Sequence, residues 1–191
     1  MTLVPKESEE LKFINILKSK HARYVTGGEI VSKEAVADDF VPPGAALGKI
    51  TGSAKYGPVT RDVVGTGGAD ASANTIPLAG LNETDWHNWQ VGDSIIIDPG
   101  ESGEETAVIT AVDEAGGTLS VDSISTAHAA GVSVQKNDGS STAQFVCLDL
   151  IDLSEEDAIV GGITHGALYR ERMPNYDEIV DADLPLISFE L

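Results

Sequence analysis

Cysteine and long apolar runs are both scarce in this chain of 191 residues. The single cysteine, Cys147, excludes an intramolecular disulfide and a cysteine-rich metal cage. No apolar run approaches the roughly 20 residues of a membrane span, and the first ten residues lack the basic and then apolar character of a signal peptide. We therefore expect a protein that folds without disulfides, does not enter a membrane and stays in the compartment where it is made.

Positive charge is also scarce, because 12 lysines and arginines face 31 aspartates and glutamates, which gives a formal net charge of −19. Nucleic-acid surfaces depend on clustered basic side chains, so this balance argues against nucleic acid as a partner. The charge is unevenly spread: residues 63–140 carry a net charge of −11 and residues 141–191 carry −9, whereas residues 1–24 carry +2. This asymmetry predicts that the N-terminal segment contacts a different partner from the rest of the chain.

Sequence motifs for metal binding, phosphate binding and catalysis are missing as well. The four histidines, His21, His87, His128 and His165, show none of the spacings of a zinc site. Residues 98–105 gather four carboxylates near a turn but lack the alternation of a calcium-binding EF-hand loop, so we interpret them as a solvated loop. The chain has neither a phosphate-binding glycine motif nor a nucleophile elbow. The sequence therefore predicts a structural or binding protein without a cofactor or a metal, and not an enzyme.

Strand and turn signals dominate what is present. The stretch at 55–59 reads as an edge strand, because Pro58 cannot donate to a ladder. Asn175 is placed to cap a short helix over 176–183, and the apolar residues 184–191 are expected to pack down or to meet a neighbouring subunit. The remaining strands expected outside the central region lie at 29–32, 46–51, 143–151 and 158–169.

The central region has a β pattern of its own. Residues 65–74 are small and polar and read as a linker, and residues 138–141 read as the exit linker. Both tryptophans, Trp86 and Trp89, lie between these linkers, which indicates a separate core. The pattern is typical of a small barrel or sandwich with strands at 75–78, 94–97, 105–112, 118–121 and 132–134.

The N-terminal segment, residues 1–24, is polar with one apolar cluster. The apolar positions follow helical spacing in part, so a short helix packed on its own domain and an extended arm both remain open. If the segment binds a partner, we expect apolar anchors flanked by lysines that steer them towards an acidic surface. The candidate residues are Leu11, Lys12, Phe13, Ile14, Leu17, Lys18 and Lys20.

Four stretches on the two sides of the central region resemble one known family. Residues 43–56 (PGAALGKITGSAKY) resemble the LGKIT and SxKY core of the lambda-type phage head decoration proteins. Residues 138–151 (DGSSTAQFVCLDLI) and 158–168 (AIVGGITHGAL) are similar to two later stretches of that family, and residues 16–24 are similar to the end of its N-terminal arm. The family has a short loop where this chain carries about 75 residues, 63–137. The chain also has an acidic segment, 175–183, where the family has an Ala-rich helical stretch.

The resemblance implies a mainly β fold with short helices, in which a β-clip-like decoration-protein core carries an inserted small β-barrel or sandwich module. The implied domains are an N-terminal capsid-binding arm over 1–24, the core over 25–62 and 138–191, and the insert over 63–137. The implied function is that of a cement protein, a homotrimer on the outer surface of the virion head. It would bind the major capsid protein at three-fold positions of the expanded head, after assembly in the host cytoplasm, and stabilise the shell against internal DNA pressure.

Two other classes of function remain open. The first is a phage tail or host-attachment surface protein built of small β modules, which would need no capsid arm. The second is a hydrolase, favoured if a pocket gathered Asp98, Glu101 and Glu105. The insert offers a surface-ligand site if Trp86 and Trp89 are exposed and stack on a host glycan or protein, whereas core positions for both rings are the simpler interpretation.

Overall fold

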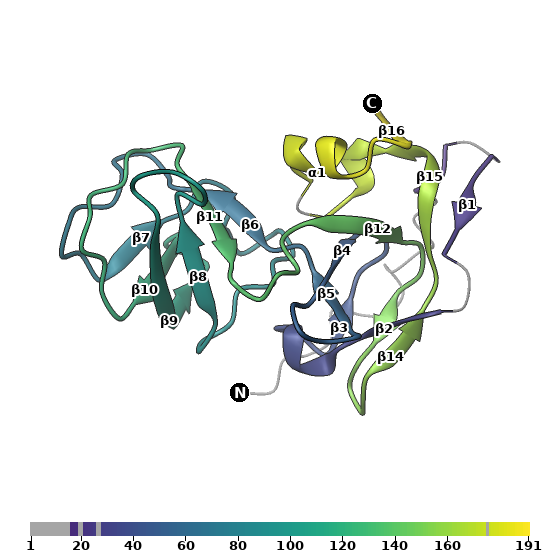
Figure 1. Ribbon diagram of the computed structural model, residues 1–191, viewed down its shortest axis with the longest axis horizontal. Coiled ribbons are helices and arrows are strands. Elements are labelled where there is room, and N and C mark those ends of the chain that lie inside the picture. The colour runs from purple at the N-terminus through teal and green to yellow at the C-terminus, as the bar shows by residue number, and fades with distance from the viewer. Residues whose placement is uncertain (1–15, 19–20, 26–27, 175) are drawn as a thin grey trace.

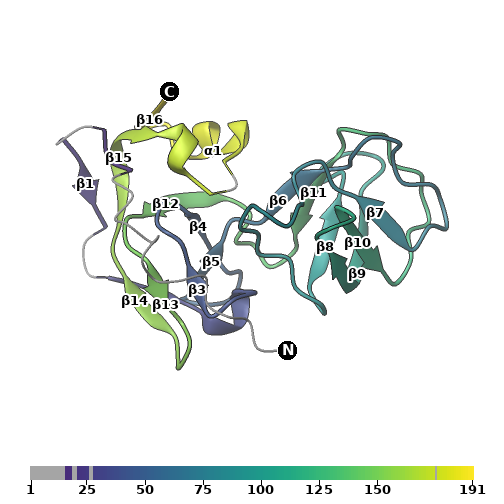
Figure 2. The ribbon, with the colours of Figure 1, turned by 180° about the vertical axis from the view of Figure 1, so that it is seen from behind.

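The computed structural model describes residues 16–18, 21–25, 28–174 and 176–191, and the chain is mainly β with one short α-helix. The mainly β fold predicted from the sequence is confirmed. Two bodies of curled sheet lie side by side along the long axis, and β6 and β11 approach the boundary between them (Figures 1 and 2). The short elements are η1 (Lys33–Ala35), β3 (Phe40–Val41), β13 (Ile151–Asp152), η2 (Arg170–Arg172) and α1 (Glu178–Asp183).

The larger body is an eight-stranded sheet in the order β1-β15-β12-β4-β5-β2-β14, with β16 paired to β15. Neighbouring strands are mostly antiparallel, and β16 runs parallel to β15. Of the two outcomes expected for the apolar C-terminal tail, packing down is observed at Leu184 and Ile187, which are buried, whereas Leu186 and Leu191 are exposed. The bounds of its strands are β1 Arg23–Tyr24, β2 Glu29–Val31, β4 Ala46–Lys49, β5 Tyr56–Pro58, β12 Ala143–Cys147, β14 Ala158–Val160, β15 Gly162–Tyr169 and β16 Ile187–Glu190.

The expectation that residues 55–59 form an edge strand is wrong, because β5 lies between β4 and β2. The two strands β2 and β5 pair only at Val31 and Tyr56. The ladder on that side therefore has no pairing at Pro58, and the missing N–H of the proline is not needed there.

The smaller body is a six-stranded sheet in the order β6-β11-β8-β9-β10-β7, curled around its own apolar core. Its outer strands meet through an antiparallel bridge between Val64 and Leu78 and through a hydrogen bond of 2.8 Å from the N–H of Gly65 to the carbonyl of Pro77. The sheet therefore returns upon itself as a small barrel. The bounds of its strands are β6 Arg61–Val63, β7 Thr75–Pro77, β8 Ser94–Ile97, β9 Glu105–Asp113, β10 Thr118–Val121 and β11 Ser133–Lys136.

Two segments expected to be linkers belong to the folded bodies. Ala69 is buried and forms a β bridge with His128, so residues 65–74 are part of the barrel wall. Ser140 and Ser141 are buried, and the hydroxyl of Ser141 donates to the carbonyl of Lys136 at 2.7 Å. Small polar residues are typical of linkers, but the backbone groups of these two segments are used in turns and bridges.

The C-terminal helix is shorter than predicted and has a different cap. The side chain of Asp177 accepts a hydrogen bond from the N–H of Val180 and caps α1, whereas Asn175 lies outside the described residues. An aspartate fits this position because it satisfies a free N–H and places negative charge at the positive end of the helix.

Candidate binding surfaces

The described part of the N-terminal segment is extended and lies along β15. The N–H of Lys18 donates to the carbonyl of Ala167 at 2.9 Å, and the N–H of Tyr169 donates to the carbonyl of Ile16 at 3.0 Å. Ile16 is only 2% exposed and packs in an apolar cluster that includes Leu168. For residues 16–18 and 21–25, the helical alternative is therefore wrong. The segment is instead anchored to its own domain at Ile16.

Two of the predicted arm residues have partners within the chain. Leu17 is partly buried and bridges Leu168, and the ammonium group of Lys18 forms an ion pair of 2.6 Å with Glu190. The hydrogen bond to Glu190 raises the pKa of Lys18 above its ordinary value and lowers that of the glutamate. Both candidates therefore help to fix the segment on β15 and β16. The other candidates, Leu11, Lys12, Phe13, Ile14 and Lys20, lie outside the described residues.

The two tryptophans do not form an exposed platform. Trp89 is 4% exposed and belongs to the core of the barrel. Trp86 is partly buried and packs against a core cluster of the larger body. The alternative in which both rings stack on a surface ligand is wrong for Trp89, because a buried ring offers no free face.

The junction between the two bodies is held by Arg61, the first residue of β6, whose side chain is 5% exposed. Its guanidinium makes a bidentate pair with Asp177 at 3.0 and 3.1 Å. It also donates to a carboxylate oxygen of Asp183 at 3.0 Å and to the carbonyl of Ser141 at 2.9 Å. One arginine thus ties the start of the barrel to both ends of α1, in the geometry for which its planar fork is suited.

Asn88 forms a second tie at the same junction and is 1% exposed. Its side-chain amide donates to the carbonyl of Ala35 at 2.9 Å and to the hydroxyl of Thr60 at 3.0 Å, and its oxygen accepts from the N–H of Ala37 at 2.7 Å. Buried polar groups with all partners in place favour one arrangement over others. The barrel is therefore held at a fixed position and does not hang on a flexible linker.

Sequence reasoning missed both ties. Arg61 lies 116 residues from Asp177, and Asn88 lies 53 residues from Ala35. The one local signal is Arg61, an arginine close to a predicted strand in a chain with few basic residues. That signal does not indicate which distant carboxylates the arginine contacts.

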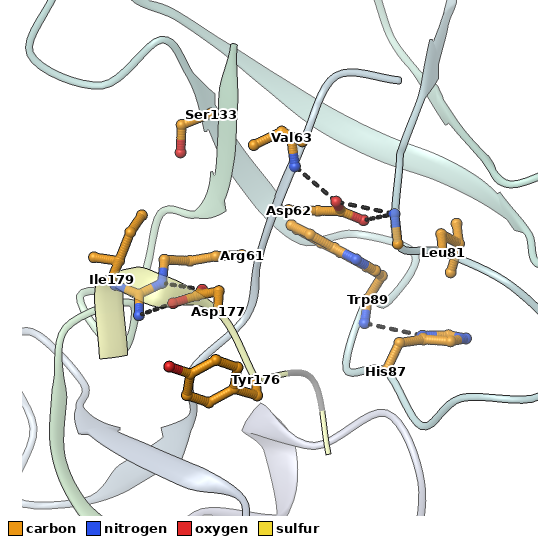
Figure 3. Close-up of a pocket in the computed structure, with 11 residues that line it drawn as sticks. Arg61, Asp62, Val63, Leu81, His87, Trp89, Ser133, Tyr176, Asp177 and Ile179 are labelled. Carbon is orange, nitrogen blue, oxygen red and sulfur yellow. Dashed lines mark hydrogen bonds and ion pairs between the residues drawn. The ribbon is translucent and has the colours of Figure 1, made fainter. Parts of the chain in front are cut away.

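A cavity of about 220 Å³ opens beside this junction (Figure 3). Trp89 lies between Asp62 and His87 in this view, and the carboxylate of Asp62 accepts the N–H groups of Val63 and Gly80. Burial raises the pKa of Asp62, although these hydrogen bonds oppose the rise. The carboxylate of Asp62 is thus occupied by backbone N–H groups of the fold. The lining residues are Arg61, Asp62, Val63, Gly80, Leu81, His87, Trp89, Ser133, Tyr176, Asp177 and Ile179.

The other polar candidates also have structural partners. Glu105 accepts the N–H groups of Ser125 and Thr126 and lies 3.3 Å from Nε2 of His128. Burial opposes ionisation of Glu105, but these hydrogen bonds outweigh it and lower the pKa. Cys147 is fully buried, and desolvation raises its pKa to about 12, so the thiol stays protonated.

Within the described residues, no group of three or more histidine, cysteine, aspartate or glutamate side chains is arranged to hold a metal ion. No helix in the same part of the chain has the length and the apolar character needed to cross a membrane. No family model, curated protein or solved structure matches this chain.

Proposed function

We propose that this protein is a capsid decoration protein that binds the major capsid protein on the outer surface of a phage head and stabilises the expanded shell. One observation supports this proposal above the others. The stretches that resemble the lambda-type decoration proteins supply the adjacent strands β15, β12 and β4 of one sheet, although the 75 residues 63–137 lie between β4 and β12 in sequence.

The residues that carry the resemblance also contact each other closely. A Cβ atom on Gly48, in the LGKIT stretch, would lie 2.0 Å from the carbonyl oxygen of Ser140 in the DGSS stretch. In return, the N–H of Thr51 donates to the carbonyl of Asp138 at 2.8 Å, and Gly139 adopts a φ of 89° beside it. Glycine is required at position 48 because backbone carbonyl oxygens fill the space, and at position 139 because of the positive φ and the close approach of Thr51. The two motifs therefore form one structural unit, as expected if the barrel is an insertion into a decoration-protein core.

The mechanism follows from linkage. A protein that binds the expanded lattice and not its precursor stabilises the expanded lattice by the free energy of binding. In a homotrimer, three tethered N-terminal segments act at high effective concentration, so each needs only a modest affinity. Residues 1–24 carry the net positive charge that steers them towards an acidic capsid surface, and the barrel region, with its net charge of −11, repels other particles.

The test uses unexpanded and expanded heads assembled from the major capsid protein of the same virus. The full chain should bind expanded heads saturably and unexpanded heads far more weakly. A variant lacking residues 2–14 keeps Ile16 and its cluster, so it should retain the fold and lose binding. Equal binding of the truncated and full-length proteins would contradict the role of the arm.

A charge-matched pair of variants separates the arm from the net charge of the protein. Lys12→Glu changes the arm, and Lys49→Glu makes the same change at an exposed position of β4. We expect the first variant to weaken binding to expanded heads at least tenfold and the second to change it less than twofold. Equal effects of the two variants would show that only the overall charge matters.

A further inference from the structure

A groove of about 630 Å³ lies between residues 80–86 of the barrel and residues 170–176 of the larger body. Its volume falls within the range of about 300–1,000 Å³ that is typical of ligand pockets, and such pockets occur preferentially where two domains meet. The groove is wider than the cavity beside Arg61, although Gly80 and Tyr176 line both. The junction of the two bodies therefore offers room for a ligand on its own surface.

The barrel wall of the groove is a loop that one asparagine holds in shape. The side-chain oxygen of Asn82 accepts the N–H groups of Thr84 and Asp85 at 2.9 and 3.0 Å. Its amide donates to the carboxylate of Asp85 at 2.8 Å. Trp86 follows directly, packs on a core cluster of the larger body and lines the groove. Unlike Trp89, Trp86 is only partly buried, so the ring is held in place without being enclosed.

The opposite wall is fixed as well. The segment of η2 packs on the turn at Gly44, where a Cβ atom would lie 3.2 Å from the carbonyl oxygen of Arg172. The guanidinium carbon of Arg170 lies 5.5 Å from the ring centroid of Tyr176. The guanidinium carbon of Arg172 lies 4.1 Å from the ring centroid of Tyr169. Such cation–π contacts orient both guanidinium groups at this wall.

Positive charge at this place stands out from the surrounding sequence. Arg170 and Arg172 are the only lysine or arginine residues in 141–191, a segment with a net charge of −9. In the described part of the chain, Arg170 forms no ion pair with a carboxylate, whereas Arg61 contacts two. A guanidinium group has five N–H donors and binds a carboxylate through two parallel hydrogen bonds. A ligand with a carboxylate group therefore complements this wall.

The remaining groups of the groove favour a saccharide over a simple anion. The face of an indole ring is negative and attracts the weakly positive C–H groups of a sugar ring. Asp85 and Glu171 are exposed carboxylates that line the groove, and they can accept hydrogen bonds from sugar hydroxyl groups. The same two carboxylates repel a densely charged anion such as an acidic peptide.

We propose that this groove binds a saccharide that carries a carboxylate group. The sugar ring stacks on Trp86, the carboxylate of the sugar accepts hydrogen bonds from Arg170, and sugar hydroxyl groups donate to Asp85. The proposal goes beyond the proposed function, because it requires neither the N-terminal segment nor a capsid.

The first test is titration calorimetry of the full chain with a panel of short oligosaccharides that contain glucuronic, galacturonic, mannuronic or sialic acid. Each is paired with its methyl ester, which keeps the rings and removes the charge. At least one acidic oligosaccharide should bind saturably, and its methyl ester should bind at least tenfold more weakly. A panel without any binding member, or esters that bind as well as the acids, would overturn the proposal. Equal binding of a glutamate oligomer would also overturn it, because the groove would then recognise charge without a sugar ring.

Two variants test the separate contacts with the acidic oligosaccharide that binds best. Arg170→Gln should reduce the affinity to that of the methyl ester, and Trp86→Phe should weaken the binding of both, because the smaller ring covers less of the sugar. Arg23→Gln removes the same charge at an exposed position outside the groove and is the matched control. Circular dichroism should show unchanged folds.

A further control separates this groove from capsid binding. The variant lacking residues 2–14 should bind the oligosaccharide as the full chain does, whatever its behaviour towards heads. Undiminished binding by Arg170→Gln, or an equal loss in Arg23→Gln, would contradict the assignment of the site to this groove.

Discussion

Replacement of Arg61 tests whether the barrel is held rigidly by buried charge pairs. The Arg61 side chain is 5% exposed, whereas the side chains of its partners Asp177 and Asp183 are 31% and 16% exposed. Arg61→Met keeps most of the aliphatic stem but leaves both carboxylates without their cation. The same change removes the donor to the carbonyl of Ser141.

Removing one partner of a buried ion pair costs about 3–5 kcal/mol, because the remaining charge stays desolvated. Here the two aspartates retain partial access to water, which relieves part of that penalty. We therefore expect the free energy of unfolding to fall by about 3 kcal/mol, at the lower end of that range. Arg61→Lys keeps the charge without the planar fork, so its loss should lie between zero and that value.

The assay is urea unfolding followed by fluorescence of Trp86 and Trp89, at a concentration where the chain is monomeric. Lys49→Met, at an exposed position, is the control and should stay within about 0.5 kcal/mol of the original chain. Adding Asp177→Asn and Asp183→Asn to Arg61→Met should recover part of the loss, because both unpaired charges are then gone. A loss no larger than that of the control, or no recovery in the triple variant, would refute the reasoning.

Three further predictions concern single side chains. Ile16→Ala should lower the free energy of unfolding by about 3 kcal/mol in the same assay, because it empties a site that is 2% exposed. Glu105→Gln should destabilise the barrel at neutral pH. Because the pKa of Glu105 is lowered in the folded state, the ionised carboxylate stabilises the fold fully above its ordinary pKa of 4.5. This stabilisation is lost as the pH falls through the pKa of the folded state. The difference in free energy of unfolding between the original chain and Glu105→Gln should therefore disappear in acid. Cys147, with a pKa of about 12, should resist iodoacetamide at pH 8 until urea unfolds the chain, and labelling of the folded protein would contradict its burial.

Strand positions were the part of the fold that the sequence predicted well. The strands predicted at 94–97 and 118–121 are β8 and β10. In both strands buried and partly buried residues alternate, because each strand places one face against the barrel core. Short strands of this kind have local signals, namely β-branched residues between turn residues.

The errors arose where a residue's role depends on distant partners. Pro58 signalled an edge strand, but the pairing of β2 with β5 stops before it, and that register is not a local property. The small residues of 65–74 resembled a linker, yet Ala69 pairs with His128, 59 positions away. The cap of α1 is Asp177 and not the predicted Asn175, because asparagine and aspartate are equivalent in capping preference and the sequence alone does not choose between them.

The candidate sites were less predictable than the fold. The charge asymmetry led to the N-terminal segment, but that signal did not reveal that Leu17 and Lys18 are engaged by β15 and β16. Arg61 and Asn88 carry no motif, and their importance follows from burial and geometry alone.

The most direct measurement of the central claim compares the heat and osmotic-shock resistance of DNA-filled heads with and without this protein. Heads saturated with the full chain should release their DNA at a higher temperature than bare heads, and heads incubated with the variant lacking residues 2–14 should behave like bare ones. Identical release temperatures for bare and saturated heads, with binding confirmed on the same particles, would contradict a cementing role.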